Sequence, residues 1–256
     1  MADQKTKAEQ FKALHVAGKP LVLFNVWDAG SARAVAATQT PALATSSWAV
    51  AAAHGLADGE KLPLNLVIAN LQRIVAAVDL PVSIDIESGY DDPAKTVERA
   101  IEAGAIGANM EDSLPQDGTL REVSQQVARI RKARCAADAL GIPFFLNART
   151  DVFFQKGASN SDASLMQSAI ERAKAYADAG ADGLFIPGLT DVERVAELVA
   201  ASTLPVNVML DANVPDPGEF AQAGVARVSY GPAPYLLMMK ALENSAGQTL
   251  KAWRPN

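Results

Sequence analysis

Short apolar segments rich in β-forming residues alternate along the chain with longer segments rich in Ala, Glu, Arg and Leu. This alternation is typical of parallel strands joined by helices. We predict strands at residues 21–26, 42–45, 82–86, 106–110, 144–146, 183–186, 206–209 and 226–229. We predict helices at residues 65–78, 94–103, 122–140, 164–179, 192–201 and 235–243, with a further short helix at the N-terminus that includes His15.

The connections between these segments indicate the fold class. Three similar elements, Glu102-Ala103-Gly104-Ala105, Asp178-Ala179-Gly180-Ala181 and Gln222-Ala223-Gly224-Val225, are typical of helix C-termini that lead into the next strand. Eight strands alternating with helices predict an α/β (β/α)8 TIM barrel. A doubly wound sheet is the alternative, but Asp28-Ala29-Gly30-Ser31-Ala32-Arg33 lacks the three glycines of a dinucleotide-binding turn.

Composition and charge predict a single domain and a small-molecule partner. Pro and Gly are spread along the 256 residues without a linker-like stretch, so we expect a single barrel domain over residues 1–256. The net charge of −6 and the scattered Lys and Arg residues argue against nucleic acid and anionic membranes as partners. The polar N-terminus, the absence of a long apolar run and the single Cys135 predict a cytoplasmic protein.

Acidic side chains follow the third and fourth predicted strands. Asp85 and Glu87 are two residues apart, so on one strand they would both point into the barrel mouth, and Glu111 follows the neighbouring strand. Three crowded carboxylates would repel one another unless a cation neutralised them. The pattern therefore predicts a site for Mg²⁺, or alternatively Mn²⁺, held largely through water molecules. The alternative is that Glu87 and Glu111 are solvated loop charges and that Asp112 caps a helix.

Two further strand ends carry groups that suit an anionic ligand. Arg149 ends the fifth strand, where its guanidinium could bind a carboxylate or phosphoryl group in two-pronged fashion. The alternative for Arg149 is a structural ion pair with Asp151 or Glu111. Ser46 and Ser47 follow the second strand and offer donors for a second anionic oxygen. Lysine is absent from the strand ends, which argues against a Schiff-base aldolase, and the two histidines argue against a histidine-rich metal centre.

Four motifs together resemble the isocitrate lyase/phosphoenolpyruvate mutase superfamily: Asp85-Ile86-Glu87-Ser88-Gly89-Tyr90, Met110-Glu111-Asp112, Asn147-Ala148-Arg149-Thr150-Asp151 and Ala179-Gly180-Ala181-Asp182. The likeness runs from about Phe24 to Tyr235. It implies a (β/α)8 barrel whose last helix is exchanged between subunits of a homodimer or homotetramer, and which uses magnesium to bind a small anionic 2-oxo or 2-hydroxy acid. By position, the resemblance implies metal-binding roles for Asp85, Glu87 and Glu111. It also implies catalytic roles for Asp58 and Arg149 and substrate binding by Ser46, Ser47, Asp85 and Arg149, with Arg149 as the anchor and the two serines as the carboxylate-binding turn.

One loop departs from the best-known members of this superfamily. Isocitrate and methylisocitrate lyases carry Lys-Lys-Cys-Gly-His after the fourth strand, whereas this chain reads Ser113-Leu114-Pro115-Gln116-Asp117-Gly118. Without that thiol, a proton would come from water, Asp58, Asp117 or the substrate. We therefore expect a magnesium-dependent lyase or decarboxylase that cleaves a C–C bond through an enolate. A mutase or hydrolase acting on the C–P bond of a phosphonopyruvate-like substrate is the enzymatic alternative, and a keto-acid sensor is the non-enzymatic one.

Overall fold

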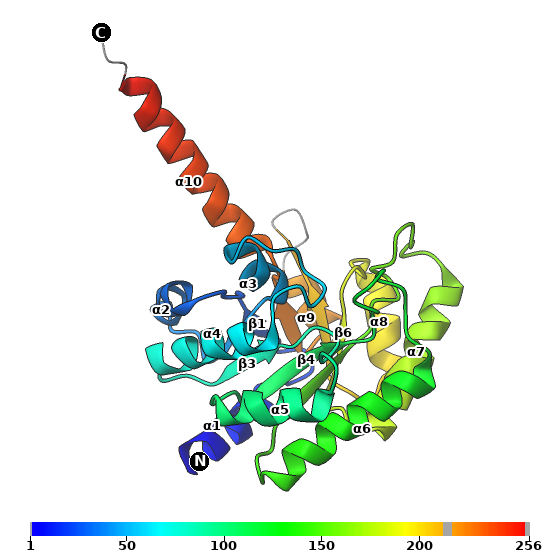
Figure 1. The fold of residues 1–256 in the computed structure, drawn as a ribbon. Helices are drawn as coiled ribbons and strands as arrows, with labels where there is room; N and C mark the ends of the chain where they lie inside the picture. The colour runs from blue at the N-terminus through cyan, green and yellow to red at the C-terminus, as the bar shows by residue number, and fades with distance from the viewer. Residues whose placement is uncertain (1, 212–216, 254–256) are drawn as a thin grey trace.

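Eight parallel strands form the centre of the computed structural model, which describes residues 2–211 and 217–253 (Figure 1). They are β1 (Leu21–Leu23), β2 (Leu43–Ala44), β3 (Val82–Asp85), β4 (Gly107–Glu111), β5 (Phe145–Arg149), β6 (Gly183–Ile186), β7 (Val206–Met209) and β8 (Arg227–Ser229). The hydrogen-bonded order is β1-β8-β7-β6-β5-β4-β3-β2. A single parallel bridge between Val26 and Thr45 joins the two remaining edges. The predicted (β/α)8 barrel is confirmed.

The helices that surround the strands follow the predicted pattern, with three additions. They are α1 (Ala2–Ala13), α2 (Ala29–Ala36), α3 (Ser47–Ala53), α4 (Leu64–Ala77), α5 (Pro93–Glu102), α6 (Val123–Ala139), α7 (Ala163–Asp178), α8 (Val192–Ala201), α9 (Pro217–Gln222) and α10 (Ala233–Ala252). The sequence pattern missed α2, α3 and α9 because helices of 8, 7 and 6 residues contain too few turns for a clear period. No helix within the described ranges has both the length and the apolar character needed to cross a membrane.

The three Ala-Gly elements end helices as predicted. Gly104, Gly180 and Gly224 have φ angles of 98°, 98° and 87°, a left-handed conformation that glycine adopts without steric cost. The residue after each glycine donates its N–H to the carbonyl five residues earlier, at 3.0 Å in all three cases. These bonds are those of the Schellman motif, which satisfies the last helical carbonyls and turns the chain into the next strand.

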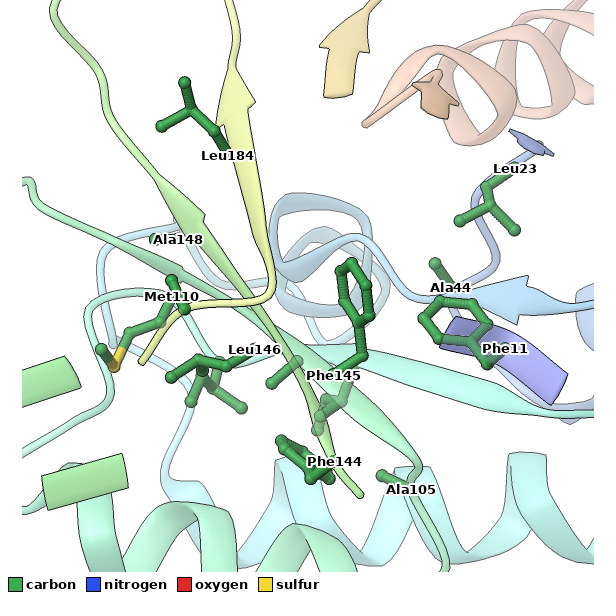
Figure 2. Packing of buried hydrophobic residues seen from close by; sticks show 14 of the residues in the cluster. Phe11, Leu23, Ala44, Ala105, Met110, Phe144, Phe145, Leu146, Ala148 and Leu184 are labelled. Carbon is green, nitrogen blue, oxygen red and sulfur yellow. The ribbon is translucent and has the colours of Figure 1, made fainter. Parts of the chain in front are cut away.

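Aromatic side chains fill the N-terminal end of the barrel. Phe11 of α1 is fully buried, and its ring meets the Phe145 ring edge-on with centroids 5.6 Å apart. Figure 2 shows Phe145 directed toward Phe11, while Leu146, the next residue of β5, lies on the opposite side of the strand. Helix α1 therefore closes one end of the barrel, and the polar strand ends lie at the other.

His15 lies outside the helix that was predicted to contain it. Helix α1 ends at Ala13, and the His15 ring stacks on Phe145 with centroids 3.9 Å apart. Its Nδ1 lies 2.8 Å from the Phe11 carbonyl. Burial, and secondly the positive charge of Arg227, lower the pKa of His15 from 6.5 to about 3. The folded protein therefore holds this histidine in its neutral form.

We expect the free energy of unfolding to fall by about 2 kcal/mol between pH 7 and pH 5 because of His15. In this range the unfolded chain takes up a proton on His15 and the folded chain does not, so the contribution is complete above pH 6.5 and is lost as the pH falls. Urea unfolding of the wild type and of His15→Gln at both pH values measures it. The pH-dependent difference should disappear in His15→Gln and persist in His54→Gln, which removes an exposed histidine; equal pH dependence in all three proteins would contradict the prediction.

Candidate active site

The predicted site residues lie at the C-terminal ends of neighbouring strands. Asp85 ends β3, Glu111 ends β4 and Arg149 ends β5, and Glu111 is directly paired with Arg149 in the strand register. These positions face the barrel mouth, where TIM-barrel enzymes place their chemistry. The barrel topology therefore brings the three side chains to one face of the molecule.

A pocket in this mouth gathers five of the predicted residues. The empty space of this mouth pocket is about 480 Å³ when the solvent at its open side is included. Its lining consists of Asn25, Ser46, Ser47, Trp48, Asp58, Asp85, Asn109, Arg149, Phe154, Phe185, Met209, Ser229, Gly231 and Pro232. Glu87 and Glu111 stand behind this surface and do not line it.

Asp85 is held between two segments that follow different strands. Its Oδ2 accepts hydrogen bonds from the hydroxyl and the backbone N–H of Ser47, at 3.1 and 3.4 Å, and its Oδ1 accepts from the N–H of Glu87 at 3.1 Å. Ser46 caps helix α3, where its hydroxyl accepts from the N–H of Ala49. Both serines therefore border the pocket, and Ser47 orients the Asp85 carboxylate.

The expectation that Glu87 points the same way as Asp85 from one strand is wrong. Strand β3 ends at Asp85, and Glu87 adopts a φ of 52°, which turns its carboxylate out of the strand pattern. Its Oε2 accepts hydrogen bonds from the N–H groups of Gly59, at 2.7 Å, and Glu60. Burial, and secondly the charge of Asp58, raise the pKa of Glu87 to about 7. Glu87 thus anchors the loop that carries Asp58.

Arg149 forms ion pairs with both acids that were considered as its structural partners. Its Nε and Nη2 donate to the two oxygens of Asp151 at 2.6 and 3.0 Å, and its Nη1 lies 2.9 Å from Oε2 of Glu111. Burial lowers the pKa of Arg149, but the charges of Asp151 and Glu111 raise it by more. The pKa of Arg149 therefore lies well above its usual value. The two-pronged face of the guanidinium therefore binds Asp151, while Arg149 also lines the pocket.

Asp58 is the acid in the pocket with the most unusual surroundings. Its Oδ1 is buried and has no hydrogen-bond partner within the described chain. Burial, and secondly the charge of Asp85, raise the pKa of Asp58 to about 6. Asp58 lines the mouth pocket, and a carboxyl group there with a pKa near neutrality and one oxygen without a hydrogen-bond donor is suited to exchange protons with a bound molecule.

The carboxylates fit a divalent cation that is bound partly through water. Burial, and secondly a neighbouring carboxylate, raise the pKa values of Asp58 and Glu87. Burial also raises the pKa of Glu111, against the opposing charge of Arg149, so a cation would relieve the repulsion among these acids. The unpartnered Asp58 Oδ1 is a further free oxygen ligand. In residues 2–211 and 217–253, however, no three His, Cys, Asp or Glu side chains are arranged to hold a metal directly. Such a site suits Mg²⁺, which retains several of its waters.

Sequence reasoning missed a buried network beneath Asp151. Asp112 is not a helix cap: its Oδ1 accepts from the N–H of Asp151 at 3.0 Å, and its Oδ2 accepts from Arg172 at 2.9 Å and from the Tyr176 hydroxyl at 2.7 Å. The side chain of Asp112 is fully buried. Its partners lie 60 and 64 residues away on α7, so no local signal could identify them.

The sequence analysis also missed polar residues that lie within the strands or just after them, although a local signal exists for such residues. Asn25, Asn109 and Ser229 line the mouth pocket. Asn25, two residues after the end of β1, accepts hydrogen bonds from the N–H groups of Tyr230 and Gly231, both at 2.9 Å, and so joins the segments that follow β1 and β8. Asn109 precedes Glu111 by two residues, which places both on the inner face of β4. An amide within an otherwise apolar strand is therefore a usable marker of the barrel interior.

A TIM barrel whose mouth combines a partly unpaired acid, oriented serines and an arginine has the architecture of a barrel enzyme's active site. The profile of the phosphoenolpyruvate phosphomutase family matches residues 11–250, and the chain belongs to this family, within the isocitrate lyase/phosphoenolpyruvate mutase superfamily. It is therefore a C–C lyase or a mutase of this superfamily.

Individual relatives agree with this assignment. An uncharacterized protein of Mycobacterium tuberculosis is 34% identical over 241 residues, which cover 92% of this chain and 87% of the relative. The 2-methylisocitrate lyase of Vibrio cholerae is 31% identical over 213 residues, covering 75% of this chain and 66% of the lyase. A crystal structure from Burkholderia cenocepacia, provisionally described as a phosphonomutase, is 52% identical with a TM-score of 0.93, and the match covers 96% of this chain and 99% of that one.

Proposed function

We propose that the protein is a magnesium-dependent enzyme that cleaves a C–C bond of a small 2-oxo or 2-hydroxy dicarboxylate through an enolate. The observation that carries this proposal is the convergence of Asp58, Asp85, Ser47 and Arg149 on one small pocket at the barrel mouth. Acids suit a cation, and the arginine and the hydroxyl of Ser46, which lines the same pocket, suit the carboxylates of the substrate. The pocket thus combines groups for binding an anion with a group for moving a proton.

Asp58 is the residue we assign to proton transfer. Its pKa of about 6 allows it to accept a proton near neutral pH, and its Oδ1 has no competing donor within the described residues. In a lyase, Asp58 would remove the proton of the substrate hydroxyl while the C–C bond breaks. In a decarboxylase it would return a proton to the enolate carbon after CO₂ leaves.

Asp85 would hold the metal, with Glu87, Glu111 and Asp58 acting through water molecules. When bound, Mg²⁺ supplies positive charge to the oxygen on which the enolate develops. Ser47 keeps the Asp85 carboxylate in one orientation through two hydrogen bonds. Glu111 and Asp151 keep Arg149 extended along the pocket wall, so the site is organised before substrate enters.

The loop after β4 favours the simpler reactions within this class. Ser113 donates to Oδ2 of Asp151 at 2.6 Å and so supports the arginine cluster. Asp117 is exposed, bonds to Thr119 and does not line the mouth pocket. Neither residue supplies the thiol that the longer lyases use, which supports decarboxylation or retro-aldol cleavage with Asp58 or water as the proton source. C–P bond chemistry is the second candidate, because the 52% identical Burkholderia cenocepacia structure is provisionally described as a phosphonomutase.

A substrate screen tests the proposal. Purified protein is assayed with oxaloacetate, 2-methylisocitrate, dimethylmalate and phosphonopyruvate, with Mg²⁺, with Mn²⁺ and with EDTA. We expect turnover of a dicarboxylate that is lost in EDTA and restored by either metal. Turnover of phosphonopyruvate alone would select the C–P reaction. Tight binding of one acid without any turnover would favour a binding protein over an enzyme.

We further propose that the protein is a homo-oligomer in which α10 packs against a second copy. Figure 1 shows α10 extending away from the barrel, and its side chains Leu237, Leu242 and Leu250 are exposed by 62%, 62% and 68%. A groove lined by Phe24, Trp27 and Val35 runs beside the start of this helix. An exposed apolar helix next to an apolar groove matches a self-complementary interface. This arrangement agrees with the helix exchange that the resemblance implies.

Replacing Leu237 and Leu242 together by glutamate is expected to convert the oligomer to a monomer, because each charge would lose its hydration in an apolar interface. Size-exclusion chromatography with light scattering measures the mass. Lys240→Gln changes an exposed residue of the same helix that pairs with Glu243, and it should leave the mass unchanged. A monomeric wild type at micromolar concentration would contradict the proposal.

A further inference from the structure

Arg227 is a fully buried arginine inside the barrel. It begins β8 and lies in register with Leu21 of β1 and Asn207 of β7. Its Nη2 donates to Oδ1 of Asn109 at 3.2 Å and its Nε donates to the Ser229 hydroxyl at 3.3 Å. The guanidinium also lies over the Phe11 ring, 5.9 Å from the centroid. It therefore occupies the layer between the aromatic plug at one end of the barrel and the polar mouth at the other.

The charge of this arginine is not balanced by a nearby acid. In residues 2–211 and 217–253 no carboxylate forms an ion pair with Arg227, and its Nη1 is buried without a hydrogen-bond partner. Burial lowers the pKa of Arg227 to about 9, and the charge of Asp85 opposes that shift, so the group stays positive at neutral pH. A buried charge without an ionic partner costs several kcal/mol. Packing alone does not account for such a residue.

Both hydrogen-bond partners of Arg227 belong to the mouth pocket. Asn109 and Ser229 line it together with Asp85 and Arg149, so the guanidinium lies directly beneath the pocket floor. Oδ1 of Asn109 also accepts from Asn147 at 2.9 Å. Because two donors converge on this oxygen, the Asn109 amide is fixed with its NH₂ group, a donor for an anion, directed away from them.

Arg227 also differs from the other arginine of the pocket in its net electrostatic effect. Arg149 is paired with both Glu111 and Asp151, so its positive charge is balanced within that cluster. Arg227 is thus the pocket's uncompensated protein cation within the described residues. We propose that Arg227 is a positioning residue that places a positive charge under the pocket floor and makes the pocket selective for dianionic over monoanionic carboxylates. The assignment rests on the proposed function, because it specifies the charge of the acid that the pocket binds.

Calorimetric binding of oxalate and of pyruvate in the same magnesium-containing buffer tests this assignment. Oxalate carries two negative charges and pyruvate one, on similarly small planar molecules. We expect Arg227→Met to weaken oxalate binding about tenfold or more and pyruvate binding much less, since the lost interaction scales with ligand charge. Arg227→Lys keeps the charge and should retain most of the preference. Arg134→Met removes a partly buried arginine that bonds to Asp182 and the Phe144 carbonyl, away from the pocket, and controls for net charge.

Thermal unfolding of the same variants separates positioning from a structural role. Exchange of an unpaired buried charge for a long apolar side chain is expected to leave the midpoint unchanged or to raise it. An Arg227→Met protein with the wild-type ratio of oxalate to pyruvate affinity would overturn the assignment. So would failure of both Arg227→Met and Arg227→Gln to fold while Arg227→Lys folds, because that result assigns a structural role. A wild type that binds neither acid would contradict the proposed function itself, and the assignment with it.

Discussion

Asp85→Asn is expected to lower kcat/KM for the best dicarboxylate substrate by about 100- to 1,000-fold, the loss typical when one preorganised electrostatic group of an active site is removed. Asp85 accepts two hydrogen bonds from Ser47 and one from Glu87, and with Asp58 it is one of the two acids that line the mouth pocket. Asparagine has the same shape but lacks the charge that would bind a cation. Steady-state kinetics over a range of Mg²⁺ concentrations measures the effect.

The control for this prediction is Asp91→Asn, which neutralises an exposed acid six residues further along the chain. It should leave kcat/KM and the magnesium dependence unchanged. Circular dichroism and the thermal midpoint should show that both variants are folded. If Asp85→Asn kept more than a tenth of the wild-type activity, with the same response to EDTA, Asp85 would not be the principal metal-binding acid.

Arg172→Met is expected to lower the free energy of unfolding by about 3–5 kcal/mol, because it leaves a buried carboxylate without its ionic partner. Arg172 donates to Asp112 at 2.9 Å and to the Arg121 carbonyl at 3.0 Å, and the Asp112 side chain is fully buried. Burial raises the pKa of Asp112, so the loss of the arginine would push this group further toward its neutral form. Chemical unfolding at one protein concentration measures the change.

Arg194→Met provides the comparison for this stability prediction. Arg194 pairs with Glu197 on the exposed side of α8, and such surface pairs contribute about 1 kcal/mol or less. Adding Asp112→Asn to Arg172→Met removes the stranded charge and should recover part of the lost stability. Equal losses in Arg172→Met and Arg194→Met would mean that the Asp112 network does not support the barrel mouth.

Local sequence pattern was sufficient for most of the barrel. Five predicted helices agree with α4 to α8 to within one residue at each end, because each has ten residues or more and so contains enough turns to show its period. Helix α10 extends to Ala252, nine residues beyond its predicted end. The sequence pattern missed this part because its apolar residues are exposed and do not form one face that packs on the barrel. The strands were found from their apolar runs, and their ends from the acids that follow.

The sequence predicted which residues belong to the site but not which of them form hydrogen bonds and ion pairs with one another. The alternation of side chains along a strand correctly placed Asp85 in the mouth, since that rule needs only the strand itself. The same rule failed two residues later at Glu87, because β3 ends at Asp85 and the Glu87 carboxylate accepts hydrogen bonds from the backbone N–H groups of Gly59 and Glu60. The sequence also did not show that Arg149 forms ion pairs with two acids, Glu111 on the neighbouring strand and Asp151 in the loop that follows β5.

The sequence by itself determined the class of fold, the strand ends that carry the chemistry and the family to which the chain belongs. Only the tertiary structure decided which charges are paired, which oxygen of Asp58 is left free, and that Arg227 lies under the floor of the pocket. The reason is physical. Periodicity along the chain reports whether a position is buried, whereas the hydrogen-bond partners of a buried charged group come from a distant segment, as Arg172 of α7 does for Asp112 and Asn109 of β4 does for Arg227.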